Sequence, residues 1–236
     1  MIPLHDDNPT ELTPYLTVSL IVACVLVFFW QLSFGEAQPR IVYALGVIPA
    51  VLFDHQRLPP ELAWVPPAAT VFTSMFLHGG WGHLLGNLLY LWIFGNNVED
   101  AMGYSRFLVF YLLCGCAAVF AQALPNPHSV VPMIGASGAI SGVLGAYLLL
   151  YPHARVLVGV PLGFYLHTMS LKAGWVLGFW FLFQVLSSAL ASGVRGGGVA
   201  WYAHVGGFVA GLALVPFCKR RGVRLFNPAR GSRWDW

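Results

Sequence analysis

Charged residues are scarce in this chain. Of its 236 residues only 9% are Asp, Glu, Lys or Arg, whereas 58% are hydrophobic. A soluble domain usually carries about 25% charged residues, and a chain this poor in charge would lack the polar surface needed to cover itself in water. The composition therefore excludes an ordinary soluble protein and indicates that lipid surrounds most of the molecule.

The long apolar stretches also lack interior carboxylates. An aspartyl protease working inside a membrane would need two of them, and ion or proton pathways usually depend on them as well. A zinc metalloprotease would need His-Glu-x-x-His, but the paired histidines of this chain, His78 and His83, are five residues apart with no Glu between them. We therefore expect neither a metal nor a cofactor.

The N-terminus has no basic segment before its first apolar run, where Asp6, Asp7 and Glu11 stand instead. A signal peptide begins with positive charge, so we expect residues 1–13 to be a short cytoplasmic segment and the first apolar run to stay in the membrane. Six of the 12 Lys and Arg lie in residues 219–236. This basic tail is short and directly follows an apolar run, so it does not indicate binding to nucleic acid.

Six apolar stretches are long enough to cross a bilayer, which takes about 20 residues of helix. Their approximate ranges are 14–33, 69–94, 107–124, 134–151, 173–191 and 199–218. They are too uniformly apolar for the alternating strands of a barrel, so the expected fold is all-α: one polytopic bundle of six transmembrane helices over residues 14–218. Stretch 156–169 is short and contains Pro161 and Gly163, which favours an interfacial loop; the alternative is a seventh span.

Lys and Arg divide unequally between the two sides of such a bundle. With six spans both termini share a side, which holds nine of these residues, whereas the other side holds Arg40, Arg57 and Arg195. Because Lys and Arg favour the cytoplasmic side, we expect both termini in the cytoplasm and the loop of residues 34–68 outside. The absence of a targeting segment suits a bacterial inner membrane.

Three histidines lie within the predicted spans, where ionisable side chains are costly and indicate function. Serine chemistry needs a nucleophile activated by an adjacent base. Ser137, in Gly135-Ala136-Ser137-Gly138, starts a span, where helix N–H groups are unpaired, and His204 is near the start of another. Both starts are on the outer side, so the two residues can meet. Taken singly, each could instead serve helix packing.

Glycines on the face of His204 favour this meeting. Gly207 and Gly211 follow the histidine by three and seven residues and share its side of the helix. A glycine face lets another helix come close. We expect that neighbour to be the stripe of small residues that begins at Ser137 and recurs every four residues.

His83 and Asn87 are four residues apart and so share one helix face. Both can donate hydrogen bonds, which is the chemistry that stabilises an oxyanion; alternatively, they tie helices together. On the same predicted helix, His78 is about half a turn away from Asn87. We expect it to face elsewhere, with a structural role.

Together these residues resemble the rhomboid family of intramembrane serine proteases. The resemblance covers about residues 14–217, and its motifs occur in the family's order. They are His78-x4-His83-x3-Asn87, Gly135-Ala136-Ser137-Gly138, His204-x2-Gly207-x3-Gly211 and Gly95-x3-Glu99-x3-Gly103, the last resembling the short turn after the second span.

The resemblance implies a serine endopeptidase that cuts transmembrane segments of other membrane proteins near the outer face. Ser137 would be the nucleophile and His204 its base, without an acidic third member. His83, Asn87 and the backbone N–H of Ser137 would form the oxyanion hole, in a pocket that opens between the second and fifth spans. The alternative is an inactive relative that binds membrane segments without cutting them.

Supporting roles fall to further residues. Structural support is expected from His78, Gly135, Gly138, Gly207, Gly211 and Glu99, and also from Arg106. In one respect the chain departs from the pattern. Some family members have an aromatic residue one turn after the nucleophile that stacks on the histidine, whereas this chain has Ser141, which could hydrogen-bond the ring instead.

Overall fold

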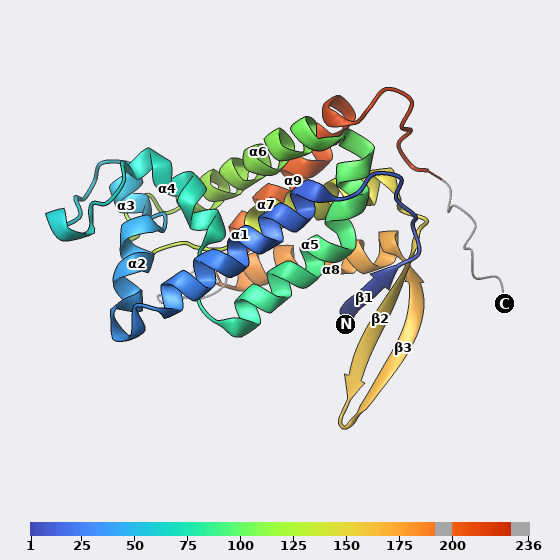
Figure 1. Ribbon diagram of the computed structural model, residues 1–236, viewed down its shortest axis with the longest axis horizontal. Helices are drawn as coiled ribbons and strands as arrows, with labels where there is room; N and C mark the ends of the chain where they lie inside the picture. Colours follow the sequence, from blue (N-terminus) through green and yellow to red (C-terminus); the bar gives the residue numbers. More distant parts are fainter. Residues whose placement is uncertain (192–199, 228–236) are drawn as a thin grey trace.

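The computed structural model describes residues 1–191 and 200–227, and most of them are helical (Figure 1). Six long helices form one bundle: α1 (Tyr15–Leu32), α5 (Trp81–Met102), α6 (Tyr104–Ala123), α7 (Ser137–Leu150), α8 (Ala173–Ala191) and α9 (Trp201–Cys218). Short helices fill the connection from α1 to α5: η1 (Gly35–Ala37), α2 (Gln38–Leu45), α3 (Pro49–Leu52), η2 (Pro60–Leu62), α4 (Pro67–Thr73) and η3 (Ser74–Phe76).

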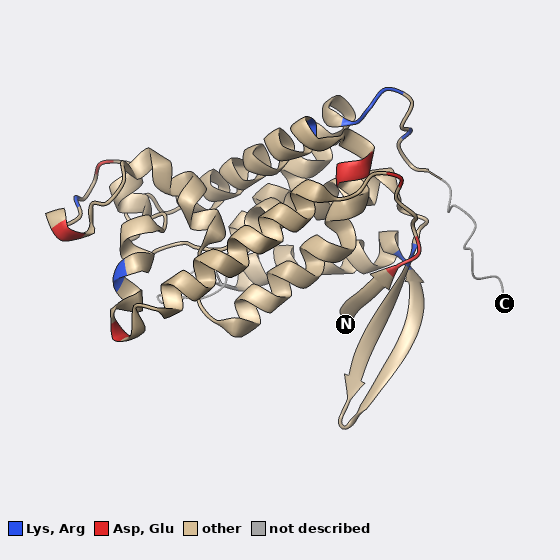
Figure 2. Cartoon of the chain, in the orientation of Figure 1, with Lys and Arg blue, Asp and Glu red and all other residues tan. Residues whose placement is uncertain are grey.

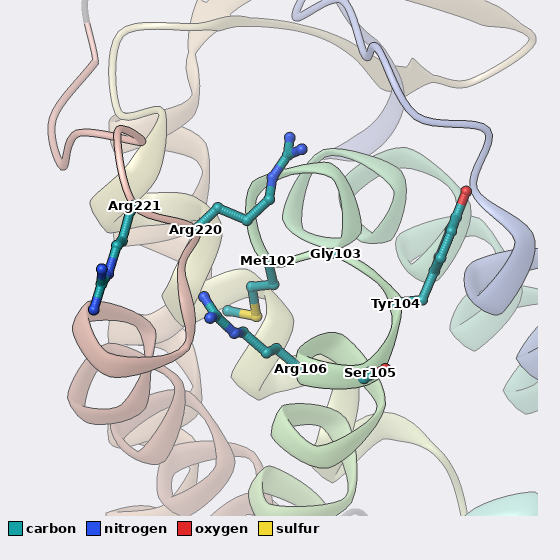
Figure 3. Close-up of a pocket in the computed structure, with 7 residues that line it drawn as sticks. All are labelled: Met102, Gly103, Tyr104, Ser105, Arg106, Arg220 and Arg221. Carbon is teal, nitrogen blue, oxygen red and sulfur yellow. The ribbon is translucent and has the colours of Figure 1, made fainter.

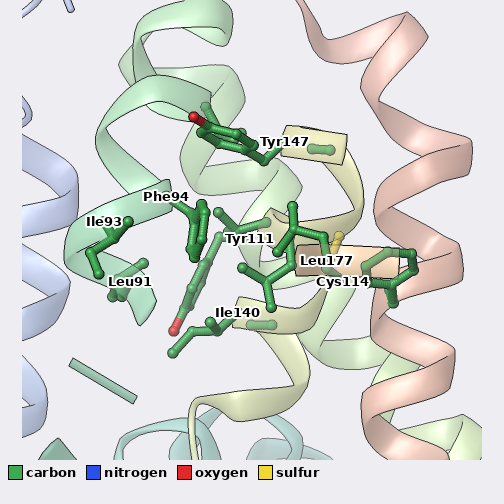
Figure 4. Packing of buried hydrophobic residues seen from close by; sticks show 14 of the residues in the cluster. Leu91, Ile93, Phe94, Tyr111, Cys114, Ile140, Tyr147 and Leu177 are labelled. Carbon is green, nitrogen blue, oxygen red and sulfur yellow. The ribbon is translucent and has the colours of Figure 1, made fainter. Parts of the chain in front are cut away.

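Helix α7 lies at the centre of the bundle and contacts α5, α6, α8 and α9. Half of its residues are Gly, Ala or Ser, and nearly all of its residues are buried, which is possible only because neighbouring helices surround it. Large side chains from those neighbours complete the core around it. Among them, Phe94, Tyr111 and Leu177 point toward α7 and Tyr147 (Figure 4).

Four of the helices, α1, α6, α8 and α9, are long and apolar enough to cross a membrane. The protein is therefore an integral membrane protein, as its composition predicts. Helix α5 has 22 residues but carries Glu99 and Asp100 in its last turn, and α7 has only 14 residues. The predicted total of six spans includes α5 and α7, and it stays a prediction for these two helices.

The second predicted span is placed wrongly at its start. Residues 69–94 do not form one helix, because the chain folds into α4 and η3, leaves helical structure at Leu77 and begins α5 only at Trp81. Gly79 and Gly80 stand at this break, and Gly80 is extended (φ 160°, ψ 173°). Glycine is costly within a helix, so two in succession favour a new helix start.

The expectation of an all-α chain is also wrong in part, because a small sheet stands at one end of the bundle. Its order is β1 (Ile2–Asp6), β2 (Arg155–Leu162) and β3 (Tyr165–Lys172), with both pairs antiparallel. The stretch interpreted as an interfacial loop is thus the β2–β3 hairpin. Residues 1–13, expected as a plain terminal segment, supply its third strand.

Close contact between α7 and α9 sets the distance between the two helices. A Cβ atom on Gly207 would overlap the carbonyl oxygen of Gly138, and one on Gly211 would overlap that of Gly142. Similarly, Gly145 lies against the carbonyl oxygen of Phe208. The predicted close approach is therefore present, although Gly138 and Gly142, one residue beyond the expected serines, receive the two glycines of α9.

Polar contacts hold together the end of the bundle where α1 and α6 start and α5 and α9 finish. Glu99 is fully buried, and its carboxylate accepts hydrogen bonds from the backbone N–H groups of Leu16 and Thr17 at 2.9 and 2.7 Å. These are free donors of the first turn of α1, where a negative charge is favourable. At the same end, Arg106 donates to the carbonyl oxygen of Lys219 at 3.1 Å.

The two ends of the bundle differ in charge. Figure 2 shows Lys and Arg gathered where α9 ends and the tail begins, with the acidic residues of α5 beside them. Of the six basic residues expected in the tail, Arg230 and Arg233 lie outside the described residues, as does Arg195 of the loop before α9. Between the ends, the described helices carry no Lys, Arg, Asp or Glu.

Candidate active site

Ser137 and His204 meet at the end of the bundle opposite the charged end. Ser137 is the first residue of α7, and His204 lies in the first turn of α9. The Nε2 atom of His204 is 2.9 Å from the Oγ atom of Ser137, although the residues are 67 positions apart in the chain. The glycine contacts between α7 and α9 place the two helix starts within this reach.

A residue that the sequence did not point to holds the other side of the histidine ring. Gln184 of α8 is nearly fully buried, and its Oε1 atom is 2.8 Å from Nδ1 of His204. An amide oxygen only accepts, so Nδ1 carries the ring proton and the neutral ring presents Nε2 as an acceptor to the Ser137 hydroxyl. Gln184 is the only amide side chain in α8, which was the available signal.

The expected role of Ser141 is wrong. Its hydroxyl donates to the carbonyl oxygen of Ser137 at 2.6 Å, which is local bonding within the helix and leaves the ring untouched. Aromatic neighbours of His204 are Trp180 of α8, at 6.0 Å between ring centroids, and Trp201 at the start of α9 itself, at 6.3 Å. Because these two tryptophans enclose the ring of His204, an aromatic residue at position 141 is not needed for that purpose.

His83 lies beside Ser137, in the first turn of α5. A Cβ atom built on Gly135 would be 2.6 Å from His83 Nε2 and 3.7 Å from Ser137 Oγ, so Gly135 fits between the two side chains. Its φ of 120° is also one that other residues rarely adopt. The Nδ1 atom of His83 accepts from the backbone N–H of Gly79 at 3.4 Å, which leaves the proton on Nε2, facing the serine.

Asn87 follows His83 by one turn of α5 and is buried. Its Nδ2 atom has no hydrogen-bond partner among the described residues. A buried donor without a partner is costly, so such a group calls for an explanation, and a donor reserved for a bound ligand is one.

His78 does not lie where the sequence placed it. It precedes α5 instead of belonging to it, and its ring packs edge-on against His83 with centroids 5.2 Å apart. The prediction that it faces elsewhere is wrong because it assumed one continuous helix. Its Nδ1 atom pairs with the carbonyl oxygen of Phe76 at 3.1 Å, and the side chain of Gln31 on α1 bonds both its N–H and its carbonyl oxygen.

A hollow in the described surface lies elsewhere. It has a volume of about 450 Å³, opens at the charged end of the bundle and is lined by residues 102–106, Arg220 and Arg221 (Figure 3). Arg220 pairs there with Asp100 at 2.9 Å. Within the described ranges, no group of three or more His, Cys, Asp or Glu could hold a metal ion.

Comparison with known protein families shows to which family the chain belongs. The family model described as the rhomboid domain matches residues 67–221, which is more than half of the chain and includes Ser137, His204, His83 and Asn87. The chain belongs to the rhomboid family. The resemblance noted in the sequence is thereby confirmed.

Rhomboid relatives occur in several kinds of organism. The chain is 30% identical over 197 residues to Rhomboid protein 1, mitochondrial, of Saccharomyces cerevisiae, which covers 76% of this chain and 54% of the yeast protein. It is 35% identical over 136 residues to Rhomboid protease GluP of Bacillus subtilis, covering 57% of this chain and 24% of that protein. With Rhomboid protease GlpG of Klebsiella pneumoniae it shares 27% identity over 199 residues, covering 84% and 61%.

The matched part is only a portion of some of these rhomboid proteins. The chain spans about half the length of the yeast relative and about a quarter of the Bacillus one. The residues matched by the family model, 67–221, include the serine and the histidine. Because relatives come from mitochondria as well as bacteria, the expected bacterial inner membrane stays a prediction.

Proposed function

We propose that this protein is a serine endopeptidase that hydrolyses peptide bonds in or near transmembrane segments of other membrane proteins. The observation that carries the proposal is the 2.9 Å contact between Ser137 Oγ and His204 Nε2, inside an apolar bundle and at the starts of two helices. Hydrogen-bond reach between nucleophile and base is the requirement for an activated serine. The names of several relatives, GlpG and GluP among them, describe them as proteases.

In the proposed reaction, Ser137 Oγ attacks the carbonyl carbon of the scissile bond while its proton passes to His204 Nε2. The tetrahedral intermediate collapses when His204 returns that proton to the leaving nitrogen, which breaks the C–N bond and leaves an acyl group on Ser137. Water then attacks the ester with His204 again as base, releasing the acid and restoring the serine. The dyad needs no acidic third member, because Gln184 fixes the ring proton on Nδ1.

Three donors would stabilise the oxyanion of the intermediate. The backbone N–H of Ser137 is free because it belongs to the first turn of α7. Nε2 of His83 faces the serine across Gly135, and the buried Nδ2 of Asn87 has no partner among the described residues. Donors placed in advance, in surroundings that exclude water, typically contribute about 10²–10³ in rate each.

The remaining residues support this arrangement. His78 packs on His83 and joins it to α1 through Gln31. Gly135 leaves room for the His83 ring, and the pairs of Gly207 with Gly138 and of Gly211 with Gly142 set the approach of α9 to α7. Glu99 anchors the start of α1 far from the chemistry.

The charge distribution supports a placement in the membrane. Residues 14–218 would form a six-span domain, with residues 1–13 and the basic residues 219–236 on the cytoplasmic side. The dyad is then near the outer surface, and a substrate segment would reach it from the bilayer, between α5 and α8. Transmembrane proteins and the lipid bilayer are thus the expected partners.

The proposal is tested by labelling with a fluorophosphonate probe, which reacts with activated serines whatever the natural substrate. The full chain in lipid should be labelled, whereas Ser137→Ala and His204→Ala should lose labelling while keeping the same unfolding midpoint. The same three proteins should then cleave, or fail to cleave, a reconstituted reporter with one transmembrane segment. Equal labelling of wild type and Ser137→Ala would remove Ser137 as the nucleophile. A reporter that binds uncut to an unlabelled wild type would instead support the inactive, segment-binding alternative.

A further inference from the structure

The hairpin of β2 and β3 extends beyond the part of it that the bundle holds. Near its base, Val156 and Val158 are fully buried in the main core, and β1 pairs with β2 as far as Gly159. Past this point the two strands pair only with each other, up to the two-residue turn at Gly163 and Phe164. Figure 1 shows this outer half standing clear of the helices.

The free half of the hairpin is strongly apolar. Its most exposed side chains belong to large hydrophobic residues of the tip: Leu162, Phe164, Tyr165 and Leu166. Between Arg155 and Lys172 the sequence has no Asp, Glu, Lys or Arg. Exposed apolar surface of this kind is unfavourable in water, and a contiguous patch usually marks an interaction site.

The lipid bilayer is the partner that best fits the apolar hairpin. The hairpin joins the end of α7 directly to the start of α8, a helix that is long and apolar enough to cross a bilayer. It therefore begins where the bundle leaves the lipid, on the end opposite Ser137. A patch that continues the lipid-facing surface of the bundle is most simply covered by the same lipid.

Charge at the base of the hairpin fits this partner. Arg155 and Lys172 are directly opposite each other in the strand pairing, and both are exposed. Arg106, Arg220 and Arg221 line the hollow at the same end of the bundle (Figure 3). Positive side chains beside an apolar tip are what an anionic lipid surface attracts.

The free edge of β3 limits how deep the tip can go. Within the described residues β3 is an outer strand of the sheet, so one side of its backbone has N–H and C=O groups without strand partners. Hydrocarbon does not tolerate such groups, whereas the headgroup boundary supplies water and polar atoms. Tyr165 at the tip also suits that boundary, where aromatic residues with a polar end gather.

We propose that the β2–β3 hairpin is a membrane-docking element. Its tip, residues 162–166, inserts into the boundary between headgroups and acyl chains of the leaflet at the charged end of the bundle, and Arg155 and Lys172 at its base contact anionic headgroups. The hairpin thereby anchors the start of α8 to the bilayer. This inference needs only a membrane-embedded chain and does not depend on proteolysis.

The test uses the full chain with an environment-sensitive NBD label on Phe164→Cys. The matched control is His153→Cys, an exposed residue just before the base of the same hairpin. Cys116 and Cys218 are half-buried and are replaced by Ser in both, whereas Cys24 and Cys114 are buried. The proteins are reconstituted in vesicles of phosphatidylcholine and phosphatidylglycerol that carry a nitroxide high on the acyl chain, and unfolding midpoints confirm that both variants fold.

The docked tip should give blue-shifted emission at position 164 and several-fold stronger nitroxide quenching than at position 153. Arg155→Gln with Lys172→Gln should reduce that quenching, and so should vesicles without phosphatidylglycerol. Equal quenching and equal emission maxima at the two positions would overturn the proposal. Shielding at position 164 that persists in detergent and falls on dilution would also overturn it, because a second copy of the chain would then cover the patch.

Discussion

At the scale of single residues, the partner of His204 Nδ1 is the amide of Gln184 and not a carboxylate. A carboxylate beside the ring would carry its charge into an apolar bundle, where an incompletely paired charge is very costly. The Gln184 oxygen offers an acceptor without a charge. This acceptor still specifies that Nδ1 carries the ring proton, which leaves Nε2 as the acceptor that faces Ser137.

Replacing Gln184 tests that role. Gln184→Leu should lower kcat about 10- to 100-fold with little change in KM, because the ring loses the partner that orients it and not a contact with substrate. Gln184→Glu keeps an acceptor and should restore part of the loss. Reporter cleavage in lipid gives both constants. Equal kcat in Gln184→Leu and wild type would show that the bond does not matter.

Gln122 provides the matched control, since it is a second glutamine close to the same helix. It accepts from the backbone N–H of Ala203 at 3.2 Å, whereas the described hydrogen bonds of the His204 ring go to Gln184 and Ser137. Gln122→Leu should therefore lower the unfolding midpoint, and it should affect kcat less than Gln184→Leu does. If both glutamine variants lost kcat equally, general loosening of α9 would explain the result.

The sequence was informative about residues whose chemistry is conspicuous in a membrane. Histidines and a serine among small residues stand out in apolar spans, so Ser137, His204, His83 and Asn87 could all be named. Gln184 was missed because an uncharged amide in an apolar helix attracts little attention. His78 was misplaced because helical spacing has meaning only within one helix, and the helix had not yet begun.

At the scale of elements, the apolar runs predicted the positions of the helices well when no glycine pair interrupted them. Residues 14–33 and 173–191 correspond to α1 and α8 almost residue for residue. The double glycine before Trp81 broke the second run. For stretch 156–169, an apolar run of this length is ambiguous between loop, strand and helix, and pairing with β1 near the N-terminus could not be read locally.

The contact of α7 with α9 is an element-scale feature that can be tested with one methyl group. Gly211→Ala would press a Cβ atom onto the backbone of Gly142 and should cost about 1–3 kcal/mol of stability, as overpacking does. Because the helices must separate, cleavage should fall by roughly 100-fold, as small misplacements of reacting groups do. Thermal unfolding and reporter cleavage measure the two effects.

Gly178→Ala is the control for that change. It lies in α8, and a Cβ atom there would meet nothing within 4 Å. Replacing a helical glycine by alanine at an open position should be neutral or stabilise by up to about 1 kcal/mol, with cleavage unchanged. Similar losses in both variants would mean that the close approach of α7 and α9 has no special role.

The strand β1 should respond to pH through Asp6. This carboxyl is buried and accepts from the hydroxyl of Tyr147 at 2.6 Å, and burial raises its pKa from 3.8 to about 6. A raised pKa means that the folded state favours the protonated form. The stabilisation is complete below pH 3.8 and is lost as the pH rises through about 6.

That dependence is measured as the difference in unfolding midpoint between wild type and Asp6→Asn. Asparagine stays neutral, so the variant should gain on wild type by about 1.4 kcal/mol between pH 5 and pH 7.5, because the part of the shift above pH 5 spans about one pKa unit. A constant difference across this range would show that Asp6 does not titrate on folding. Asp7 serves as a neighbouring control, since Asp7→Asn should leave the pH dependence of wild type in place.

At the scale of the whole molecule, the basic tail and the pair of Ser137 and His204 lie at opposite ends of one bundle. Ser137 starts α7 and His204 lies in the first turn of α9, whereas the ends of the same two helices lead to the hairpin and to the basic tail. This polarity follows from chain direction, because α7 and α9 run the same way through the bundle. The orientation in the membrane would therefore decide where the proposed protease cuts its substrates.

Cysteine accessibility in intact cells tests that orientation. In a background with Cys116→Ser and Cys218→Ser, Asn126→Cys lies in the exposed loop just before the nucleophile, and Arg224→Cys lies in the exposed part of the tail. The protein is produced in bacterial cells whose outer membrane is made permeable, so that a membrane-impermeant maleimide reaches the outer face of the inner membrane. The maleimide should label position 126. It should label position 224 only after the inner membrane is permeabilised as well, because Lys and Arg favour the cytoplasmic side. The reverse pattern would place the dyad near the cytoplasmic surface, and substrates would then be cut at their inner ends.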